Sequence, residues 1–214
     1  MNTTKLIIIR HGESLGNLNK IYLGHTDWDL SELGYRQAEI TANYLADVKI
    51  DAVYSSDLLR AYNTVLPIAK MRGLEIIKDE NLREVFAGEW EGKSYDELWE
   101  NYSDDFKIWR TDIGNARCTG GESVMELKDR IFNAVKRIAK ENYGKTICIG
   151  THATALRALK GACNNISKDD FKNIPWVSNA SVTYAEFDGE KLIMTEYGKD
   201  DFLNDFKTTV SSKV

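Results

Sequence analysis

The chain has 214 residues, of which 43% are hydrophobic and 29% charged, and 28 basic against 33 acidic residues give a net charge of −5. This composition is ordinary for a folded globular protein and too apolar for a disordered one, and the acidic balance argues against a nucleic-acid partner, which would need a basic surface. No run approaches the roughly 18 apolar residues of a membrane span, and the start, MNTTKLIIIR, has too few apolar residues for a signal peptide.

The three cysteines, Cys118, Cys148 and Cys163, follow no spacing typical of a disulfide framework or a metal site. Without a membrane or secretion signal, they favour a reducing, cytoplasmic location. The chain has no internal repeat, low-complexity stretch or linker-like change in composition. We therefore expect a single domain over residues 1–214, with a polar tail whose last residues, 208–214, are disordered.

Short apolar runs alternate with amphipathic segments along most of the chain. The predicted strands cover residues 6–9, 52–54, 74–77 and 146–149. One predicted helix begins after Ser31, and three others cover residues 58–71, 124–138 and 153–159. Gly73 is typical of a helix end, and Pro67 should kink or split the helix that contains it. Residues 181–187 and 191–197 flank Asp188-Gly189, which predicts a hairpin. Strands that alternate with helices favour a layered α/β fold with a mainly parallel sheet.

Unusual polar residues follow three of the predicted strands. Arg10 and His11 end the first, a segment from Ser55 to Arg60 follows the second, and a Thr-His pair at 151–152 ends the strand over residues 146–149. Ligands of such sheets bind beyond the carboxyl ends of the strands. A parallel sheet would therefore place all three polar groups on the same edge.

The residue types at this edge suit chemistry on a phosphoryl group. A neutral imidazole such as that of His11 is a good nucleophile toward phosphorus, and guanidinium groups match the geometry of phosphate oxygens. Arg10, Arg60 and His152 would surround His11, and Glu84 would supply the proton that the leaving alcohol needs. Taken alone, each of these residues reads as an ordinary structural or surface residue, and only their expected convergence favours a site.

A metal site is not expected. His11, His25 and His152 lie far apart in sequence and lack the i, i+4 spacing of helical zinc ligands. Acidic pairs such as Asp104-Asp105 are more typical of a solvated helix surface, and we expect His25 to face solvent rather than the pocket.

Several ordered blocks of the chain resemble the histidine phosphatase superfamily, also called phosphoglycerate mutase-like. The blocks are Arg10 to Asn17 with its Arg-His-Gly motif, residues 27–38, residues 54–64 with Arg60, residues 82–92 with Glu84, residues 121–123, and Thr151-His152. The resemblance spans about residues 5–160. It implies a three-layer α/β/α fold with a mainly parallel central sheet.

The resemblance also implies roles for these residues. His11 would become a phosphohistidine, Glu84 would act as general acid and then as the base that activates water, and no metal would be required. Arg10, Arg60 and His152 would bind the transferring phosphoryl group. Asn17, Thr151 and Ala153 would complete the phosphate-binding set. Ala153 stands where the family usually has glycine, so its methyl group would narrow the pocket or move a backbone N–H.

Phosphatase and mutase activities both fit this pattern, and we favour the phosphatase. A mutase must hold a doubly phosphorylated intermediate, which calls for extra cations. The stretch between Gly92 and Gly120 is instead net acidic, with basic residues Lys93, Lys107, Arg110 and Arg117 against acidic residues Asp96, Glu97, Glu100, Asp104, Asp105 and Asp112. The alternative hypothesis is a phosphoglycerate mutase that uses 2,3-bisphosphoglycerate. A third hypothesis is a non-catalytic module that binds a phosphorylated ligand.

Aromatic residues recur at steps of three and four within residues 94–110: Tyr95, Trp99, Tyr102, Phe106 and Trp109. This spacing predicts a helix face packed on the core, and a substrate-facing lid is the alternative. The expected partner is a small phosphorylated metabolite, with no nucleic acid and no membrane, and a homodimer is left open.

Overall fold

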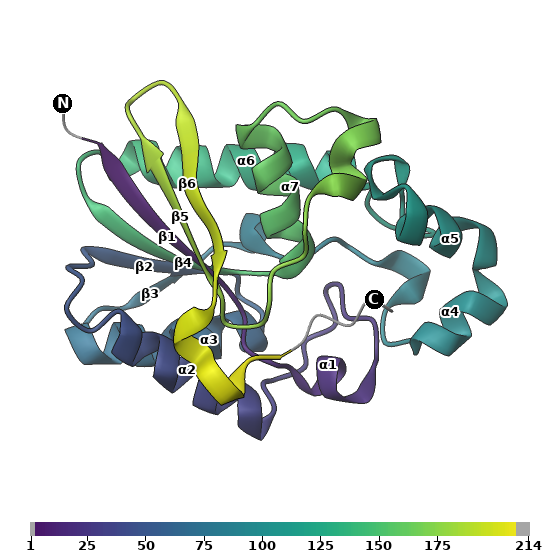
Figure 1. Ribbon diagram of the computed structural model, residues 1–214, viewed down its shortest axis with the longest axis horizontal. Helices are drawn as coiled ribbons and strands as arrows, with labels where there is room; N and C mark the ends of the chain where they lie inside the picture. The colour runs from purple at the N-terminus through teal and green to yellow at the C-terminus, as the bar shows by residue number, and fades with distance from the viewer. Residues whose placement is uncertain (1–2, 209–214) are drawn as a thin grey trace.

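The computed structural model describes residues 3–208, and its centre is one six-stranded sheet with helices on both faces (Figure 1). The strands are β1 (Thr4–Arg10), β2 (Ala52–Ser55), β3 (Ile76–Lys78), β4 (Thr146–Thr151), β5 (Val182–Phe187) and β6 (Leu192–Lys199). Their order in the sheet is β3-β2-β4-β1-β5-β6. The first four strands in this order run parallel to one another, β5 runs antiparallel to its neighbour β1, and β6 runs antiparallel to β5. The predicted α/β fold with a mainly parallel sheet is thus confirmed.

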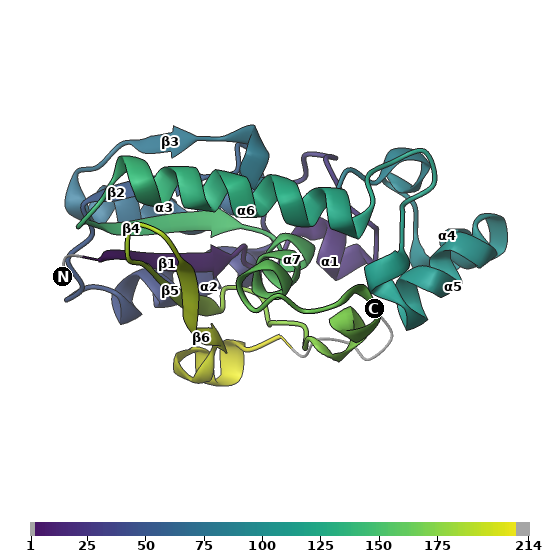
Figure 2. The same ribbon diagram turned by 90° about the horizontal axis from the view of Figure 1, so that it is seen from above.

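The helices form two layers around this sheet. The main helices are α1 (Leu15–Asn19), α2 (Glu32–Tyr44), α3 (Leu59–Arg72), α4 (Tyr95–Asn101), α5 (Ser103–Thr111), α6 (Val124–Glu141) and α7 (Ala153–Cys163). In Figure 1, α6 and α7 lie above the sheet and α2 and α3 below it, and Figure 2 shows α6 running along one face. α4 and α5 stand apart from the sheet at one end of the molecule.

Alternating residues of β1 build the two cores. Leu6 and Ile8 belong to the hydrophobic cluster that contains the buried residues of α6 and α7. Ile7 and Ile9 belong to the cluster that contains buried residues of α2 and α3. Successive side chains of a strand point to opposite faces, so a run of apolar residues is what a strand covered on both sides requires. The short run at residues 6–9 therefore fixes β1 in the centre of the sheet.

The predicted helix boundaries at Ser31 and Gly73 are found in the structure, whereas a split of the helix at Pro67 is not. Ser31 caps α2 by accepting a hydrogen bond from the backbone N–H of Gly34 at 3.1 Å, and Gly73 ends α3 in the left-handed conformation. Pro67, however, does not split its helix, because α3 continues from Leu59 to Arg72. Proline removes a single N–H donor from the helix interior, and the burial of neighbouring Ile68 helps to hold the helix on the sheet.

The aromatic segment over residues 94–110 forms two helices rather than one. Tyr102 interrupts the helix with a backbone of φ −134° and ψ 33°, and a new helix begins at Ser103 with acidic residues in its first turn, a sequence typical of a helix start. Phe106 and Trp109 are buried at 1% and 4% exposure, as the packing prediction required, whereas Trp99 remains 45% exposed.

Two expectations concern the ends and surface of the chain. Thr208 has a defined place, since its hydroxyl donates to Oδ1 of Asn179 at 3.0 Å, and the rest of the predicted disordered tail, residues 209–214, lies outside the described residues. Over residues 3–208, no helix combines the length and the apolar character that a membrane crossing requires.

Candidate active site

His11 follows β1 at the carboxyl edge of the sheet, where the backbone holds it tightly. Its N–H donates to the carbonyl oxygen of Thr151 at 2.9 Å, and the N–H of Gly12 donates to Oγ1 of Thr64 at 2.9 Å. A Cβ on Gly12 would lie 2.6 Å from the carbonyl oxygen of Gly34. Only glycine therefore allows the loop after β1 to pass this close to α2.

The hydrogen bonding of His11 determines which of its ring nitrogens carries a lone pair. Nδ1 lies 2.7 Å from the carbonyl oxygen of Gly12, and since a carbonyl only accepts, Nδ1 carries the proton and Nε2 carries the lone pair. Burial lowers the pKa of His11 well below its ordinary value, and the positive charges of Arg60 and Arg10 lower it further. The imidazole is therefore neutral at neutral pH.

Two buried arginines line the cavity into which His11 opens. Arg60 donates from Nη1 to the carbonyl oxygen of Thr26 at 2.8 Å and from Nη2 to that of Gly24 at 2.7 Å. Arg10 donates from Nη1 to the carbonyl oxygen of Val177. Burial lowers the pKa of each arginine to about 10, against the opposing charge of Glu84, so both remain cationic at neutral pH.

His152, which follows β4, lies next to His11. The two ring centroids are 5.2 Å apart with an angle of 60° between the planes. His152 is fully buried, and neither of its ring nitrogens has a hydrogen-bond partner within residues 3–208. Burial lowers its pKa well below the ordinary value, with further contributions from Arg60 and His11. A buried donor without a partner is costly. The structure thus places His152 next to His11, although His152 is not itself among the residues that line the cavity.

Glu84 reaches the same cavity from the loop after β3. Its side chain is 7% exposed. Oε1 accepts from the N–H of Val85 at 2.9 Å, and Oε2 accepts from the N–H of Thr154 in the first turn of α7 at 3.0 Å. Arg130 on α6 holds the loop by donating to the carbonyl oxygen of Glu84 at 2.9 Å. The carboxyl group is thus fixed between the loop and the start of α7.

The remaining predicted residues divide between the cavity and its support. Asn17 and Ala153 line the cavity. Thr151 does not, because its hydroxyl donates to the carbonyl oxygen of Leu82 at 2.8 Å. His25, which we expected to face solvent, is half-buried and donates from Nε2 to the carbonyl oxygen of Glu84 at 3.0 Å, and it is not among the residues that line the cavity.

Asn179 is a site residue that the sequence did not reveal. Its Nδ2 lies 3.1 Å from each of three acceptors, the carbonyl oxygens of His11 and Gly12 and Oδ1 of Asn17. It stands just before β5, and because β5 runs antiparallel to β1, the start of β5 meets the end of β1. The predicted hairpin indicated β5 but not its place beside β1, so the sequence offered no direct signal for Asn179.

The cavity has a volume of about 590 Å³ and two chemically different parts. We call Arg10, His11, Arg60 and Glu84 the polar end. The lining also includes further polar residues such as Lys20 and Asp96, and five aromatic side chains that we call the aromatic part: Tyr22, Tyr95, Trp99, Trp109 and Trp176. Trp109 packs edge-to-face on buried Trp90, with ring centroids 5.8 Å apart, so the aromatic part has a firmly packed wall. The polar end can hold a tetrahedral anion and attack it, and the aromatic part can hold what the anion is attached to.

Metal ligation has no candidate within residues 3–208, where no group of three or more His, Cys, Asp or Glu side chains could hold an ion. The three cysteines are unpaired, with Cys118 and Cys148 buried. Burial raises the pKa of Cys148 to about 12, so this thiol is uncharged and a poor nucleophile at neutral pH.

The sequence is similar to those of known proteins of one family. The family model described as "Histidine phosphatase superfamily (branch 1)" matches residues 6–200. "Phosphoserine phosphatase 1" of Hydrogenobacter thermophilus is 34% identical over 78% of this chain and 79% of the relative. "Phosphoglycerate mutase-like protein 4" of Arabidopsis thaliana is 33% identical over 91% and 84%. "Metal-independent phosphoserine phosphatase" of the same plant is 34% identical over 73% and 67%.

Solved structures agree with this sequence similarity. The structure titled "Bacillus stearothermophilus YhfR" superposes with a TM-score of 0.90 at 29% identity, over 94% of this chain and 100% of the other. The two chains thus share the arrangement of sheet and helices almost from end to end.

Proposed function

Because the chain belongs to the histidine phosphatase superfamily and is a phosphoric monoester hydrolase, we propose that it works through a phosphohistidine on His11 and needs no metal. One observation carries this mechanism. Nδ1 of His11 is held by the carbonyl oxygen of Gly12, so the lone pair on Nε2 is available beside the two arginines that line the same cavity.

In the first step, Nε2 of His11 attacks the phosphorus of a monoester bound by Arg10, Arg60 and His152. The bond between phosphorus and the ester oxygen breaks, and protonated Glu84 gives its proton to that oxygen, which leaves as an alcohol. The guanidinium groups stabilise the charge on the phosphoryl oxygens in the transition state. Asn17 and the backbone N–H of Ala153 add further donors.

In the second step, water replaces the alcohol. Glu84, now a carboxylate, takes a proton from the water as its oxygen attacks the phosphorus, and the bond from phosphorus to Nε2 breaks. Inorganic phosphate leaves, and His11 and Glu84 return to their starting states. Glu84 therefore acts once as acid and once as base, and neither step uses a metal ion.

The substrate that we propose is a small phosphomonoester. Relatives are named phosphoserine phosphatases, and the aromatic part of the cavity offers room for an organic leaving group. The net acidic segment between Gly92 and Gly120 supports hydrolysis over transfer between two phosphorylated acids. The similarity to a protein named as mutase-like keeps mutase activity as the alternative to test.

A hydrolysis screen after exhaustive chelation tests the proposal. We expect release of inorganic phosphate from several monoesters at unchanged rates with chelator, and loss of release in the His11→Ala variant. A parallel assay with 2,3-bisphosphoglycerate and a phosphoglycerate measures mutase turnover. Rapid mutase turnover with negligible hydrolysis of any monoester would contradict the proposal, as would abolition of hydrolysis by the chelator.

A further inference from the structure

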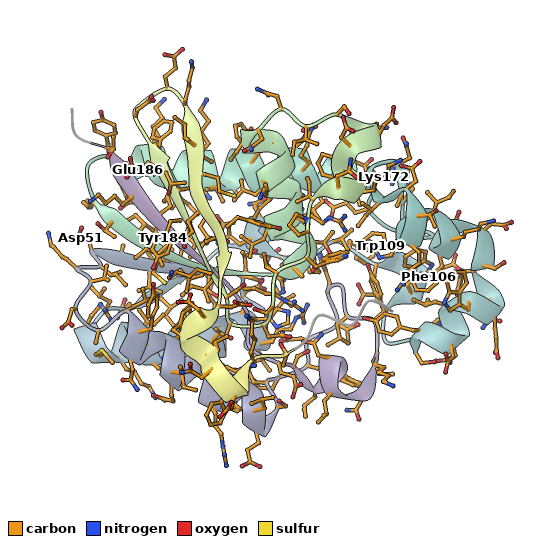
Figure 3. All side chains as sticks on the ribbon, in the orientation of Figure 1. Asp51, Phe106, Trp109, Lys172, Tyr184 and Glu186 are labelled. Carbon is orange, nitrogen blue, oxygen red and sulfur yellow. The ribbon has the colours of Figure 1, made fainter. Side chains whose placement is uncertain are left out.

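A second, smaller cavity adjoins the catalytic one. It has a volume of about 210 Å³ and shares three lining residues with the catalytic cavity, Trp109, Arg110 and Trp176. In Figure 3, Trp109 on α5 and Lys172, in the segment after α7, lie in the same part of the molecule. The two cavities therefore meet at these three residues.

The charges around this second cavity are all positive. Arg110, Arg157 and Lys172 line it, and no acidic side chain does so within the described residues. The whole chain carries a net charge of −5, so the local charge at this concave site, which three basic side chains line, is opposite in sign to that of the protein. Such a site concentrates anions.

Arg157 is fixed in this cavity before any ligand arrives. It lies on α7, the helix that begins beside His152, and its Nη2 donates to the carbonyl oxygens of Phe171 at 3.0 Å and Lys172 at 3.1 Å. Its guanidinium carbon lies 4.4 Å from the ring centroid of Trp176. These contacts hold a guanidinium against an aromatic ring, a geometry that suits arginine and not lysine.

One donor of this buried arginine has no partner. The residue is 5% exposed, and within residues 3–208 no acceptor lies at hydrogen-bond distance from its Nε. A buried N–H of a charged group without an acceptor is costly. An anionic oxygen in the cavity would satisfy it, and Lys172 at the exposed rim would add a second charge.

We propose that this cavity is a subsite for an anionic group, a carboxylate or a second phosphate, on the leaving group of the substrate. The inference rests on the proposed function, since it assigns the class of phosphomonoester that the catalytic cavity takes. The two cavities then divide the substrate: Arg10, Arg60 and His11 receive the phosphoryl group, Trp109 and Trp176 flank the organic part, and Arg157 with Lys172 receives the distal charge.

A matched pair of substrates tests the subsite. Phenyl phosphate and 4-carboxyphenyl phosphate differ only in the distal carboxylate, and we expect kcat/KM to favour the carboxylated ester about tenfold, as for one charge-assisted contact. Lys172→Glu should abolish this preference and leave kcat/KM for phenyl phosphate unchanged. Lys140→Glu makes the same charge change at an exposed position on α6 and should retain the preference. The Arg157→Met variant should also lose the preference for the carboxylated ester. If Arg157→Met does not fold, the result for Lys172→Glu alone tests the subsite.

Binding to the His11→Ala variant separates this inference from the proposed function. That variant cannot form the phosphohistidine, and calorimetry should show the same tenfold preference in affinity. If wild-type protein hydrolyses neither these esters nor any monoester of the screen while this preference persists, the proposed function is contradicted and the subsite is supported. Equal kcat/KM and equal affinity for the two esters would overturn the subsite. Added benzoate that alters phenyl phosphate hydrolysis, with no advantage for the carboxylated ester, would show a site for free anions and equally overturn it.

Discussion

At the scale of single residues, the account depends on the protonation of His11. Its Nδ1 proton is engaged by the carbonyl oxygen of Gly12, and burial together with Arg60 and Arg10 disfavours a second proton on Nε2. A histidine whose pKa is lowered stays neutral as the pH falls through its ordinary value near 6.5. The neutral imidazole that the proposed mechanism needs is therefore available across the neutral and mildly acidic pH range.

Proton NMR can follow this directly, since the chain has three histidines. We expect the imidazole signals of His11 and His152, assigned with His11→Asn and His152→Asn variants, to show no titration between pH 8 and 6, because the pKa of each is lowered well below 6.5. A midpoint near 6.5 for His11 would contradict the claim that the imidazole is held neutral.

The role of Glu84 is tested by Glu84→Gln, which keeps the shape of the side chain and removes its ability to exchange a proton. We expect kcat to fall by about 10²- to 10⁴-fold, the usual contribution of a general acid or base. Glu89→Gln is the matched control, because Glu89 is exposed and lies five positions further along the same loop, and it should keep the wild-type kcat. Steady-state hydrolysis of one ester is the measurement, and near-normal kcat for Glu84→Gln would remove Glu84 from the mechanism.

At the scale of elements, the loop after β1 joins the sheet edge to α2 through a contact that only glycine permits. We expect Gly12→Ala to lower the free energy of unfolding by about 1–3 kcal/mol, as overpacking does, and to lower kcat/KM, because the added Cβ would meet the backbone oxygen of Gly34. Gly73→Ala is the control, since a Cβ there meets nothing within 4 Å but its φ of +63° is strained. It should destabilise the protein and leave kcat/KM unchanged. Urea unfolding and kinetics measure the two effects, and unaltered kcat/KM in Gly12→Ala would refute the link.

Much of the arrangement of strands and helices could be predicted from the sequence. The apolar runs that become β1 and β4 are buried on both faces, and the polar pairs that follow them meet at one edge because the strands are parallel neighbours. Arg10, His11, Arg60 and Glu84 could thus be identified before the structure, and they share one cavity.

Other features could not be predicted because they depend on tertiary neighbours. Asn179 reaches the site only because β5 joins the sheet antiparallel to β1, and Trp176 lines the cavity from an irregular segment that has no periodic pattern. The break at Tyr102 was missed because aromatic residues at helical spacing continue through it, and the acidic start of α5 gave a competing signal that the periodicity obscured.

At the scale of the whole molecule, an acidic protein holds two buried arginines, Arg10 and Arg60, at the cavity that contains His11, so a small anion should bind and stabilise the folded state. We expect millimolar inorganic phosphate to raise Tm, since a ligand present at 100 times its Kd adds about 2.7 kcal/mol to the free energy of unfolding. The Arg10→Met variant should lose this shift, because it removes a cavity cation. Arg137→Met, which removes an arginine that binds Asp79 and Glu141 outside the cavity, should retain it. Thermal unfolding with and without phosphate is the measurement, and an equal shift in all three proteins would place the anion elsewhere.

The most direct measurement of the mechanism traps the covalent intermediate. A monoester labelled with ³²P in its phosphoryl group is mixed with the chelated protein and quenched in alkali, where a phosphohistidine survives. The account predicts label on the peptide that contains His11, retention of that label in the His25→Gln variant, and its loss in His11→Ala. Hydrolysis that proceeds while no label appears on His11, or label that persists in His11→Ala, would contradict it.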